Sequence, residues 1–151
     1  MKINITNFLD FKIYNDNINK VLNPNKTIIN TINPHSFCKT LDDKVFKKAL
    51  TRSNILLADG YGIVLASKLL YKKRINRITG ADIHDFLIKY ANEKSLKIFY
   101  LGSTEKTLNK IKTKLNFKFS NIKVHYYSPP FKNHFSNEDN KKMIFEINKV
   151  K

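Results

Sequence analysis

The chain has 151 residues, the size of one ordinary domain, and 42% of them are hydrophobic, which is enough to build a core and excludes a disordered chain. It carries 28 Lys plus Arg against 12 Asp plus Glu, a formal net charge of +16, which favours anionic partners such as nucleic acid, a membrane surface or a diphosphate. The lysines are scattered along the whole sequence, so they form no basic tail, and much of the excess can be compositional.

The amino-terminal residues 1–7 lack the continuous apolar stretch of a signal peptide, and no run approaches the ~20 apolar residues of a membrane span. We therefore expect a cytoplasmic protein. The single cysteine, Cys38, excludes an internal disulfide and a cysteine-based metal cluster. We predict that Cys38 is a small core residue of a helix.

From residue 27 onward, short β-branched or aromatic runs alternate with longer stretches of helical spacing. The predicted strands are 27–32, 54–58, 96–101 and 122–127. Such short, continuously apolar runs are typical of buried parallel strands, and their alternation with helices predicts an α/β fold with crossover connections. No linker or repeat interrupts the pattern, so we predict one domain over residues 1–151.

Five helices are predicted between and after these strands. The first has an apolar stripe of Phe37, Leu41, Val45 and Ala49, and the second, residues 61–71, is apolar nearly all round and is expected to be buried. The others carry the stripes Ile83-Phe86-Leu87-Tyr90-Ala91, Leu108-Ile111-Leu115 and Met143-Ile144-Ile147, the last with Ser136 as its N-cap. A further parallel strand is expected after this last helix, so we expect the sheet to be incomplete at its carboxyl-terminal side.

Polar residues cluster at four places in or between the predicted elements, at 31–36, 59–62, 77–82 and 101–104. Ligands of open parallel sheets bind outside the carboxyl ends of the strands, so these segments are the candidate site. Each also has a structural interpretation. Pro34 and Ser36 can open a helix, Asp59-Gly60 and Gly102-Ser103 can be turns with helix N-caps, and Gly80 can allow close packing.

The combination resembles the WecG/TagA/CpsF glycosyltransferases. The matching segments are Thr31-Ile32-Asn33, Ala58-Asp59-Gly60-Tyr61-Gly62-Ile63-Val64, Arg77-Ile78-Thr79-Gly80-Ala81-Asp82 and Ile98-Phe99-Tyr100-Leu101-Gly102. The Asp-Gly and Arg-x-x-Gly-x-Asp elements are specific as a pair. The resemblance implies a Rossmann-like open, mainly parallel sheet with helices on both faces.

The same resemblance implies an inverting transferase that moves an N-acetylmannosamine-type or related hexose from a UDP-sugar to a polyprenyl-diphosphate-linked saccharide, in cell-surface polysaccharide or teichoic acid synthesis. It implies no divalent metal and peripheral contact with the anionic inner membrane surface. The sequence agrees on the metal, because Asp42-Asp43 falls within a predicted helix and the four histidines have no paired spacing. Nucleic acid is not an expected partner.

Residue roles follow from the chemistry of inverting transfer. Asp59 is the best-placed general base, and the resemblance puts the family's catalytic threonine on Thr31. Asn33 offers a neutral hydrogen bond to the sugar or the acceptor, and Arg77 can bind diphosphate oxygens in a bidentate way. Gly60 and Gly80 are predicted at the same substrate-binding edge, and Asp82 can instead cap the helix that begins near Gly80.

The segment Gly102-Ser103-Thr104 is the predicted site for the uridine diphosphate. Gly102 allows close approach of the backbone, and Ser103 and Thr104 open a helix whose N–H groups favour an anion. The further glycines of a dinucleotide fingerprint and the lysine of a P-loop are both missing.

Members of the resembled family continue beyond the matched region, with a Gly-Pro-Lys-Gln-Glu-like strand end and a basic segment that docks on the membrane. Neither occurs here, so a non-catalytic remnant that at most binds a nucleotide sugar is the first alternative. The second is a basic nucleic-acid-binding α/β domain. Phe117-Lys118-Phe119 and Tyr126-Tyr127 interleave aromatic and basic residues only weakly for that purpose.

Overall fold

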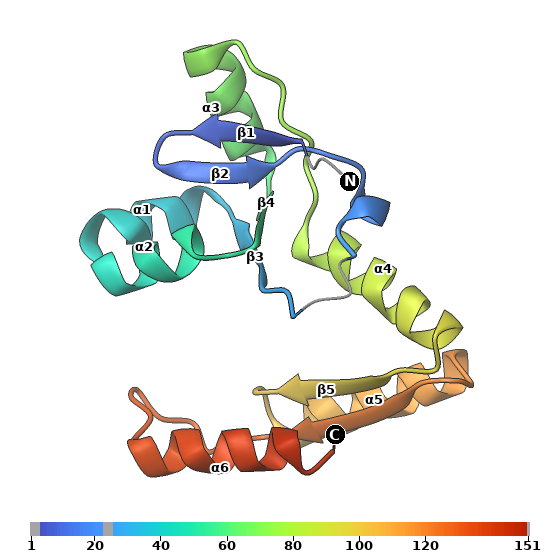
Figure 1. Cartoon of the computed structure of the whole chain (residues 1–151). Coiled ribbons are helices and arrows are strands. Elements are labelled where there is room, and N and C mark those ends of the chain that lie inside the picture. The colour runs from blue at the N-terminus through green and yellow to red at the C-terminus, as the bar shows by residue number, and fades with distance from the viewer. Residues whose placement is uncertain (1–3, 23–25, 151) are drawn as a thin grey trace. The chain divides into compact units, whose positions relative to one another are not determined.

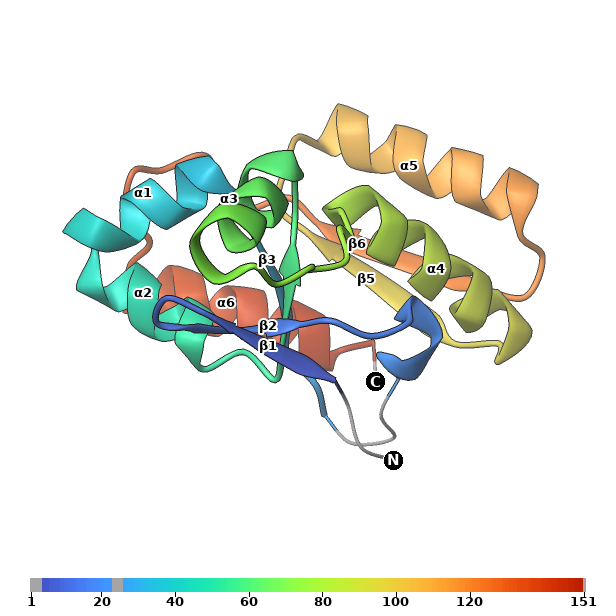
Figure 2. The same cartoon turned by 90° about the horizontal axis from the view of Figure 1, so that it is seen from above.

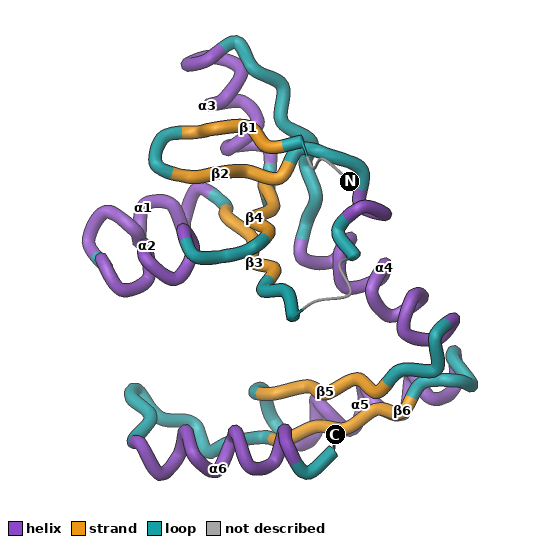
Figure 3. The backbone as a smooth tube through the Cα atoms, in the orientation of Figure 1, coloured by secondary structure: helices purple, strands orange, loops and turns teal. Residues whose placement is uncertain are grey.

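The structure is a computed structural model that describes residues 4–22 and 26–150. It is an α/β fold in which helices alternate with strands in short open sheets, as expected for a Rossmann-like chain (Figure 1, Figure 3). The chain divides into two compact units, Met1–Phe86 and Leu87–Lys151. Residues 1–3, part of the segment that lacks a signal-peptide pattern, lie outside the described residues. The assignment of residues 1–151 to one domain stays a prediction.

The first unit begins with an antiparallel hairpin that the sequence did not predict. It consists of β1 (Ile5–Phe8) and β2 (Phe11–Tyr14), with Phe8 paired to Phe11 across the turn. Leu9 in this turn has φ of 50°, a left-handed conformation for which hairpins usually use Gly or Asn. That turn signal is missing from the sequence, so the local pattern does not predict the hairpin, although Phe8, Phe11 and Ile13 are among the most buried residues.

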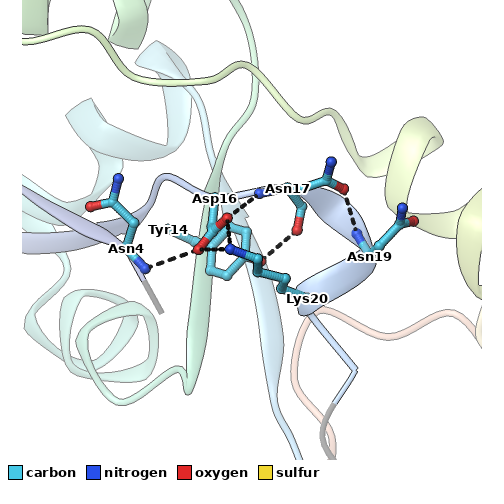
Figure 4. Close-up of polar contacts among 6 residues, drawn as sticks. All are labelled: Asn4, Tyr14, Asp16, Asn17, Asn19 and Lys20. Atoms are coloured by element: carbon cyan, nitrogen blue, oxygen red, sulfur yellow. Dashed lines mark hydrogen bonds and ion pairs between the residues drawn. The ribbon is translucent and has the colours of Figure 1, made fainter. Parts of the chain in front are cut away.

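A polar cluster fixes the chain where it leaves the hairpin, at a short 3₁₀ helix, η1 (Ile18–Lys20) (Figure 4). The Asp16 carboxylate accepts hydrogen bonds from the Lys20 ammonium, with a shortest separation of 2.9 Å, and from the Asn17 backbone N–H at 2.7 Å. These two donors lower the pKa of Asp16 below its usual value. The Tyr14 hydroxyl donates to the Asn17 carbonyl at 2.7 Å, which ties β2 to the same turn.

The central element of the first unit is a pair of parallel strands, β3 (Ile29–Ile32) and β4 (Ile55–Ala58). Their register aligns Ile29 with Ile55 and Ile32 with Ala58, so both strands end at the same edge. The predicted strands and their parallel pairing are confirmed, with β3 shorter than expected. Every residue of β4 is buried, as its continuous apolar sequence indicated.

Two helices, α1 (Pro34–Asp42) and α2 (Lys44–Thr51), connect these strands where one was predicted. Asp43 separates them in an extended conformation, and its carboxylate accepts a hydrogen bond from Phe46 N–H at 2.8 Å. Aspartate favours such caps over the helix interior, since its side chain competes for backbone N–H groups. The interruption changes which residues face the core.

The predicted apolar stripe of this connection is therefore confirmed only at Phe37 and is wrong at Leu41, Val45 and Ala49. Leu41 and Val45 are 67% and 81% exposed, whereas the buried apolar residue at the end of this connection is Leu50, outside the predicted stripe. Cys38 is exposed as well, so its assignment to the core is also wrong. The stripe assumed one uninterrupted helical period, and the restart at Asp43 breaks that period.

The next helix, α3 (Tyr61–Tyr71), has the predicted boundaries but not the predicted burial. Only Ile63 and Ser67 are buried, although the helix is apolar nearly all round. The core beneath it joins the hairpin, the parallel pair and the two connecting helices. Its buried members are Phe8, Phe11, Ile13, Ile32, Leu50, Leu56, Ala58, Ile63 and Ile75.

Helix α4 (Gly80–Glu93) runs from the first unit into the second, which continues with β5 (Lys97–Leu101), α5 (Glu105–Lys118) and β6 (Lys123–Tyr127). Strands β5 and β6 are parallel, as predicted, with Lys97 paired to Lys123. Helix α5 lies on one side of this pair and α6 (Asn137–Asn148) on the other (Figure 1, Figure 2). The core of this unit consists of Ile88, Ala91, Leu115, Ile122 and Val124.

The last helix begins as predicted. Ser136 is the N-cap of α6, and it forms a reciprocal capping box with Asp139. Of the predicted stripe, Met143 is buried, whereas Ile144 is exposed. The cap and the helix are confirmed, and the stripe is confirmed only in part.

Candidate functional site

The candidate site of the first unit lies at the carboxyl ends of β3 and β4. Asp59 directly follows β4, and its backbone N–H donates to the Ile32 carbonyl at 2.8 Å. On the other side of β4, Arg77 forms a parallel bridge with Ala58, and Ile78 N–H donates to the Ala58 carbonyl at 3.0 Å. Asp59 therefore stands between the end of β3 and the segment that carries Arg77.

The Asp59 carboxylate lies at the start of α4. The Gly80 backbone N–H donates to Asp59 Oδ2 at 3.5 Å, a long hydrogen bond. A methyl group added at Gly80 would come within 4.0 Å of the same oxygen, in ordinary contact. The helix N-terminus supplies a partial positive charge beside the carboxylate. Gly80 thus brings the N-terminus of α4 close to Asp59.

Helices α1 and α3 also begin at this edge. Gly60 is the N-cap of α3 with φ of 97°, a conformation that glycine adopts without strain. Gly62 packs so closely on the Pro34 ring, at the start of α1, that an added methyl group would clash with it. The N-termini of α1, α3 and α4 are consequently gathered around the end of β4, an arrangement that favours an anion.

Thr31 and Asn33 belong to the same edge. Thr31 is half-buried on β3 opposite Leu57. Asn33 is the N-cap of α1, where its Oδ1 accepts from Ser36 N–H at 2.8 Å and its own N–H donates to Ser36 Oγ at 2.8 Å. The structural interpretation, in which Pro34 and Ser36 open a helix, is confirmed. The Asn33 amide Nδ2 can still donate to a ligand, and that role stays a prediction.

Arg77 stacks on an aromatic ring that sequence reasoning did not connect with it. Its guanidinium carbon lies 4.8 Å from the centre of the Tyr61 ring, in cation–π geometry. Tyr61 is the first residue of α3, and no pattern in the sequence marks it as a partner of Arg77. The ring supports the guanidinium from one face and leaves its edge for an anion.

Asp82 has the capping role foreseen as its alternative. Its Oδ2 accepts from Thr79 N–H at 2.8 Å and from the Thr79 hydroxyl at 2.7 Å. Asp82 N–H in turn donates to Thr79 Oγ1 at 3.1 Å. The hydrogen bonds from Thr79, aided by the charge of Arg77, lower the pKa of Asp82. Asp82 therefore stabilises the start of α4 as an anion.

The predicted diphosphate loop lies in the second unit, after β5. Gly102 and Ser103 have φ of 108° and 61°, and Gly102 N–H donates to the Tyr127 carbonyl at 3.1 Å. Thr104 is the N-cap of α5, accepting from Thr107 N–H at 3.3 Å. The interpretation of Ser103 as the N-cap is therefore wrong, because Ser103 is left-handed and the extended cap geometry falls one residue later. Glu105 places a negative charge in the first turn of α5.

The structure thus gathers six of the predicted site residues at one edge of the first unit: Thr31, Asn33, Asp59, Gly60, Arg77 and Gly80. Gly102 and Ser103 belong to the second unit. Within residues 4–22 and 26–150, no group of three or more His, Cys, Asp or Glu side chains is arranged to hold a metal ion. No helix in that part of the chain is long and apolar enough to cross a membrane.

A family model for the WecG/TagA/CpsF family of glycosyl transferases matches residues 1–151. The chain belongs to this family. The resemblance drawn from the strand-end motifs is thereby confirmed.

Curated relatives are similar over most of the chain. An N-acetylglucosaminyldiphosphoundecaprenol N-acetyl-beta-D-mannosaminyltransferase of Bacillus subtilis is 32% identical over 127 residues, which are 83% of this chain and 47% of the relative. Proteins of the same name from Bacillus spizizenii and Staphylococcus aureus are both 28% identical, over 71% and 65% of this chain and 42% and 39% of their own lengths. The chain therefore spans less than half the length of these relatives.

Proposed function

We propose that this chain forms the donor-binding and catalytic part of a glycosyltransferase that moves an N-acetylmannosamine-type sugar from UDP to a polyprenyl-diphosphate-linked saccharide. The observation that carries the proposal is the position of Asp59 at the end of a buried strand, between Ile32 and the segment of Arg77. Family membership and the names of the relatives support the substrate class. The reaction takes place at the inner face of the cell membrane, where the lipid-linked acceptor is found.

In the proposed reaction, Asp59 acts as the general base. Its carboxylate accepts the proton of the acceptor hydroxyl while that oxygen attacks the anomeric carbon of the donor. The bond between the anomeric carbon and the diphosphate oxygen breaks, and its electron pair leaves with UDP. Attack from the face opposite to the diphosphate inverts the anomeric configuration. Thr31 and Asn33 orient the sugar or the acceptor through neutral hydrogen bonds.

Departure of UDP requires positive charge at the diphosphate, which the chain supplies without a metal. Arg77 offers a planar pair of donors, and the ring of Tyr61 restricts their orientation. The N-termini of α1, α3 and α4 add partial positive charges at the same edge. The Gly102-Ser103 loop is the proposed contact for the uridine diphosphate in the second unit.

Calorimetric titration with UDP, UDP-N-acetylglucosamine and NAD tests the donor class. We expect UDP and the UDP-sugar to bind more tightly than NAD, because the loop after β5 lacks the further glycines of a dinucleotide fingerprint. Transfer from UDP-N-acetylmannosamine to a lipid-diphosphate-linked N-acetylglucosamine tests the reaction. Equal or tighter binding of NAD would overturn the donor assignment.

A further inference from the structure

Helix α3 carries an apolar stripe on its outer side. Tyr61, Leu65 and Leu69 are spaced four residues apart, so they lie on one face, and they are 74%, 56% and 70% exposed. The opposite face packs on the core through Ile63 and Ser67. Exposed leucines in a continuous row on a rigid helix typically mark a contact surface rather than chance exposure.

Basic residues accompany the stripe and follow it. Lys68 lies within the helix, one turn after Leu65, and Lys72, Lys73 and Arg74 come directly after the last turn; all four are exposed. No Asp or Glu occurs between Asp59 and Asp82. The surface formed by Tyr61, Leu65, Leu69, Lys68, Lys72, Lys73 and Arg74, here called the α3 surface, is therefore apolar and cationic at once.

The structure fixes this basic segment beside the helix. Lys72 adopts a left-handed conformation at the C-cap, and its N–H donates to the Lys68 carbonyl at 3.1 Å. The buried Ser67 hydroxyl donates to the Lys73 carbonyl at 3.2 Å. Asn15, which follows the hairpin, donates from Nδ2 to the Arg74 carbonyl at 2.9 Å. The cations are thus anchored through their backbones, and their side chains remain exposed.

We propose that the α3 surface docks on an anionic lipid bilayer, with the leucines inserted at the headgroup boundary and the cations on lipid phosphates. Apolar side chains with Lys or Arg beside them are the combination that binds such surfaces, and a tyrosine suits the interface. A second copy of the chain fits this surface poorly, because a two-fold contact through α3 would place the same cations against one another. The formal net charge of +16 attracts the whole chain to the same surface.

In one respect the proposal rests on the proposed function: a polyprenyl acceptor has its diphosphate at the bilayer surface. The stripe begins at Tyr61, two residues after Asp59, and Arg77 lies over the Tyr61 ring. Docking of α3 would bring the strand-end site to the level of the lipid headgroups. The α3 surface is also distinct from the basic segment to which the family resemblance assigns membrane contact.

Vesicle flotation tests this surface. The probes are vesicles of phosphatidylcholine alone and vesicles of equal parts phosphatidylcholine and phosphatidylglycerol, without acceptor or donor. We expect the chain to bind the anionic vesicles at least ~10-fold more tightly than the neutral ones, and less tightly at high salt. The double variant Leu65→Gln, Leu69→Gln should lose at least ~10-fold in affinity for the anionic vesicles.

Two further variants separate the apolar and charged contributions. Lys72→Gln with Lys73→Gln should weaken binding to anionic vesicles by about tenfold, since each cation near the surface contributes to binding. Lys110→Gln with Lys114→Gln removes the same charge from α5 and should weaken it less. Because all these side chains are exposed, circular dichroism and the urea midpoint should stay unchanged.

Three results would overturn the proposal: no binding of the wild-type chain to anionic vesicles, unchanged binding of the Leu65→Gln, Leu69→Gln variant, or self-association in sedimentation velocity that this variant abolishes. The last result would make α3 an interface between copies. Failure of the transferase assay with vesicle binding retained would affect only the proposed function, because the vesicles contain neither substrate.

Discussion

The two units share one local design, a pair of parallel strands joined through helices, but carry different residues after their strands. In the first, β3 and β4 are parallel and joined through α1 and α2; in the second, β5 and β6 are parallel and joined through α5. The strand ends differ in chemistry. Asp59 follows β4, with Arg77 bridged to its last residue, whereas β5 is followed by Gly102 and Ser103. The scaffold alone therefore does not determine what each strand end can do.

If Asp59 is the general base, this difference confines the acid–base step to the first unit. After β5, the turn offers backbone N–H groups and hydroxyls, and the first ionisable side chain is Glu105, within α5. Such a turn can bind a ligand but cannot take a proton at neutral pH except through Glu105. After β4, a carboxylate and a guanidinium occupy one edge. Variants at matched positions of the two strand ends test this division.

The largest expected effect is that of Asp59→Asn. The amide keeps the size of the side chain but removes the proton acceptor, so transfer should fall by at least ~10²-fold while UDP-sugar affinity changes little. Ser103→Ala, at the matched strand end of the second unit, should reduce transfer by less than ~10-fold. Initial rates and calorimetry measure the two effects.

The rates are best compared in a version of the chain joined to the remaining part of the Bacillus subtilis relative, because the present chain spans 47% of that protein. If Asp59→Asn leaves the rate of the joined protein intact, Asp59 is not the base. If Ser103→Ala is as damaging as Asp59→Asn, the division of roles between the units is wrong.

A smaller loss is expected for Arg77→Ala. Removal of the charge should weaken UDP binding by about tenfold and slow transfer as well, since a charged hydrogen bond acts in both the ground and the transition state. Tyr61→Leu, which removes the ring but keeps the charge, should have a smaller effect on UDP binding. Arg52→Ala is the control, because Arg52 is exposed at the end of α2. A loss equal to that of Arg77→Ala in this control would show a nonspecific charge effect.

The sequence predicted the regular elements best where the pattern was long or continuous. Strands β3 to β6 and helix α4 were recognised from apolar runs and helical spacing. The hairpin is not predictable from its turn, because Leu9 rather than Gly or Asn occupies the left-handed position. The break at Asp43 and the exposure of α3 were also not foreseen, since an apolar composition does not tell which face of a helix the core covers.

The candidate site was predicted in part for a similar reason. The strand-end rule located Asp59 and Arg77, because parallel strands bring their carboxyl ends to one edge. The contact between Arg77 and Tyr61 depends on how the start of α3 approaches a segment sixteen residues later in the chain. No local pattern encodes that approach. The predicted N-cap of α5, Ser103, lies one position before the observed cap, Thr104, because several small polar residues are adjacent there.

Another comparison concerns the glycine just beyond a strand in each unit. Gly60 and Gly102 have φ of 97° and 108°, and no atom within 3.9 Å obstructs an added methyl group at either, the nearest being Pro34 Cδ at 4.0 Å from the position at Gly60. Gly60→Ala should therefore cost about 1–3 kcal/mol of unfolding free energy, because φ of 97° with ψ of 152° lies in a region essentially restricted to glycine. Gly102→Ala should cost about 1 kcal/mol from its positive φ. Urea unfolding measures both. A neutral result at either position would contradict the positive φ there.

The smallest expected effect is a difference in pH dependence between two helix caps. The start of α4 is stabilised by the Asp82 carboxylate, and α5 is capped by the neutral hydroxyl of Thr104. Because hydrogen bonds from Thr79 lower the pKa of Asp82 in the folded state, its contribution to stability is present above the unfolded pKa and is lost as the pH falls through the folded one. Asp82→Asn should therefore reduce the urea midpoint at pH 7, and this difference should shrink as the pH falls below about 4.

Thr104→Ala provides the matched variant, because a hydroxyl cap does not titrate in this range. Its destabilisation, about 1 kcal/mol for a lost N-cap, should be the same at pH 7 and at acid pH. Asp16 also has a lowered pKa, through its contact with Lys20, so the wild-type pH curve alone cannot isolate Asp82. The difference between each variant and the wild type at every pH removes that shared contribution. If the effect of Asp82→Asn persists unchanged at a pH below both the unfolded and the lowered folded pKa of Asp82, then Asp82 stabilises α4 through packing or neutral hydrogen bonds and not through its charge.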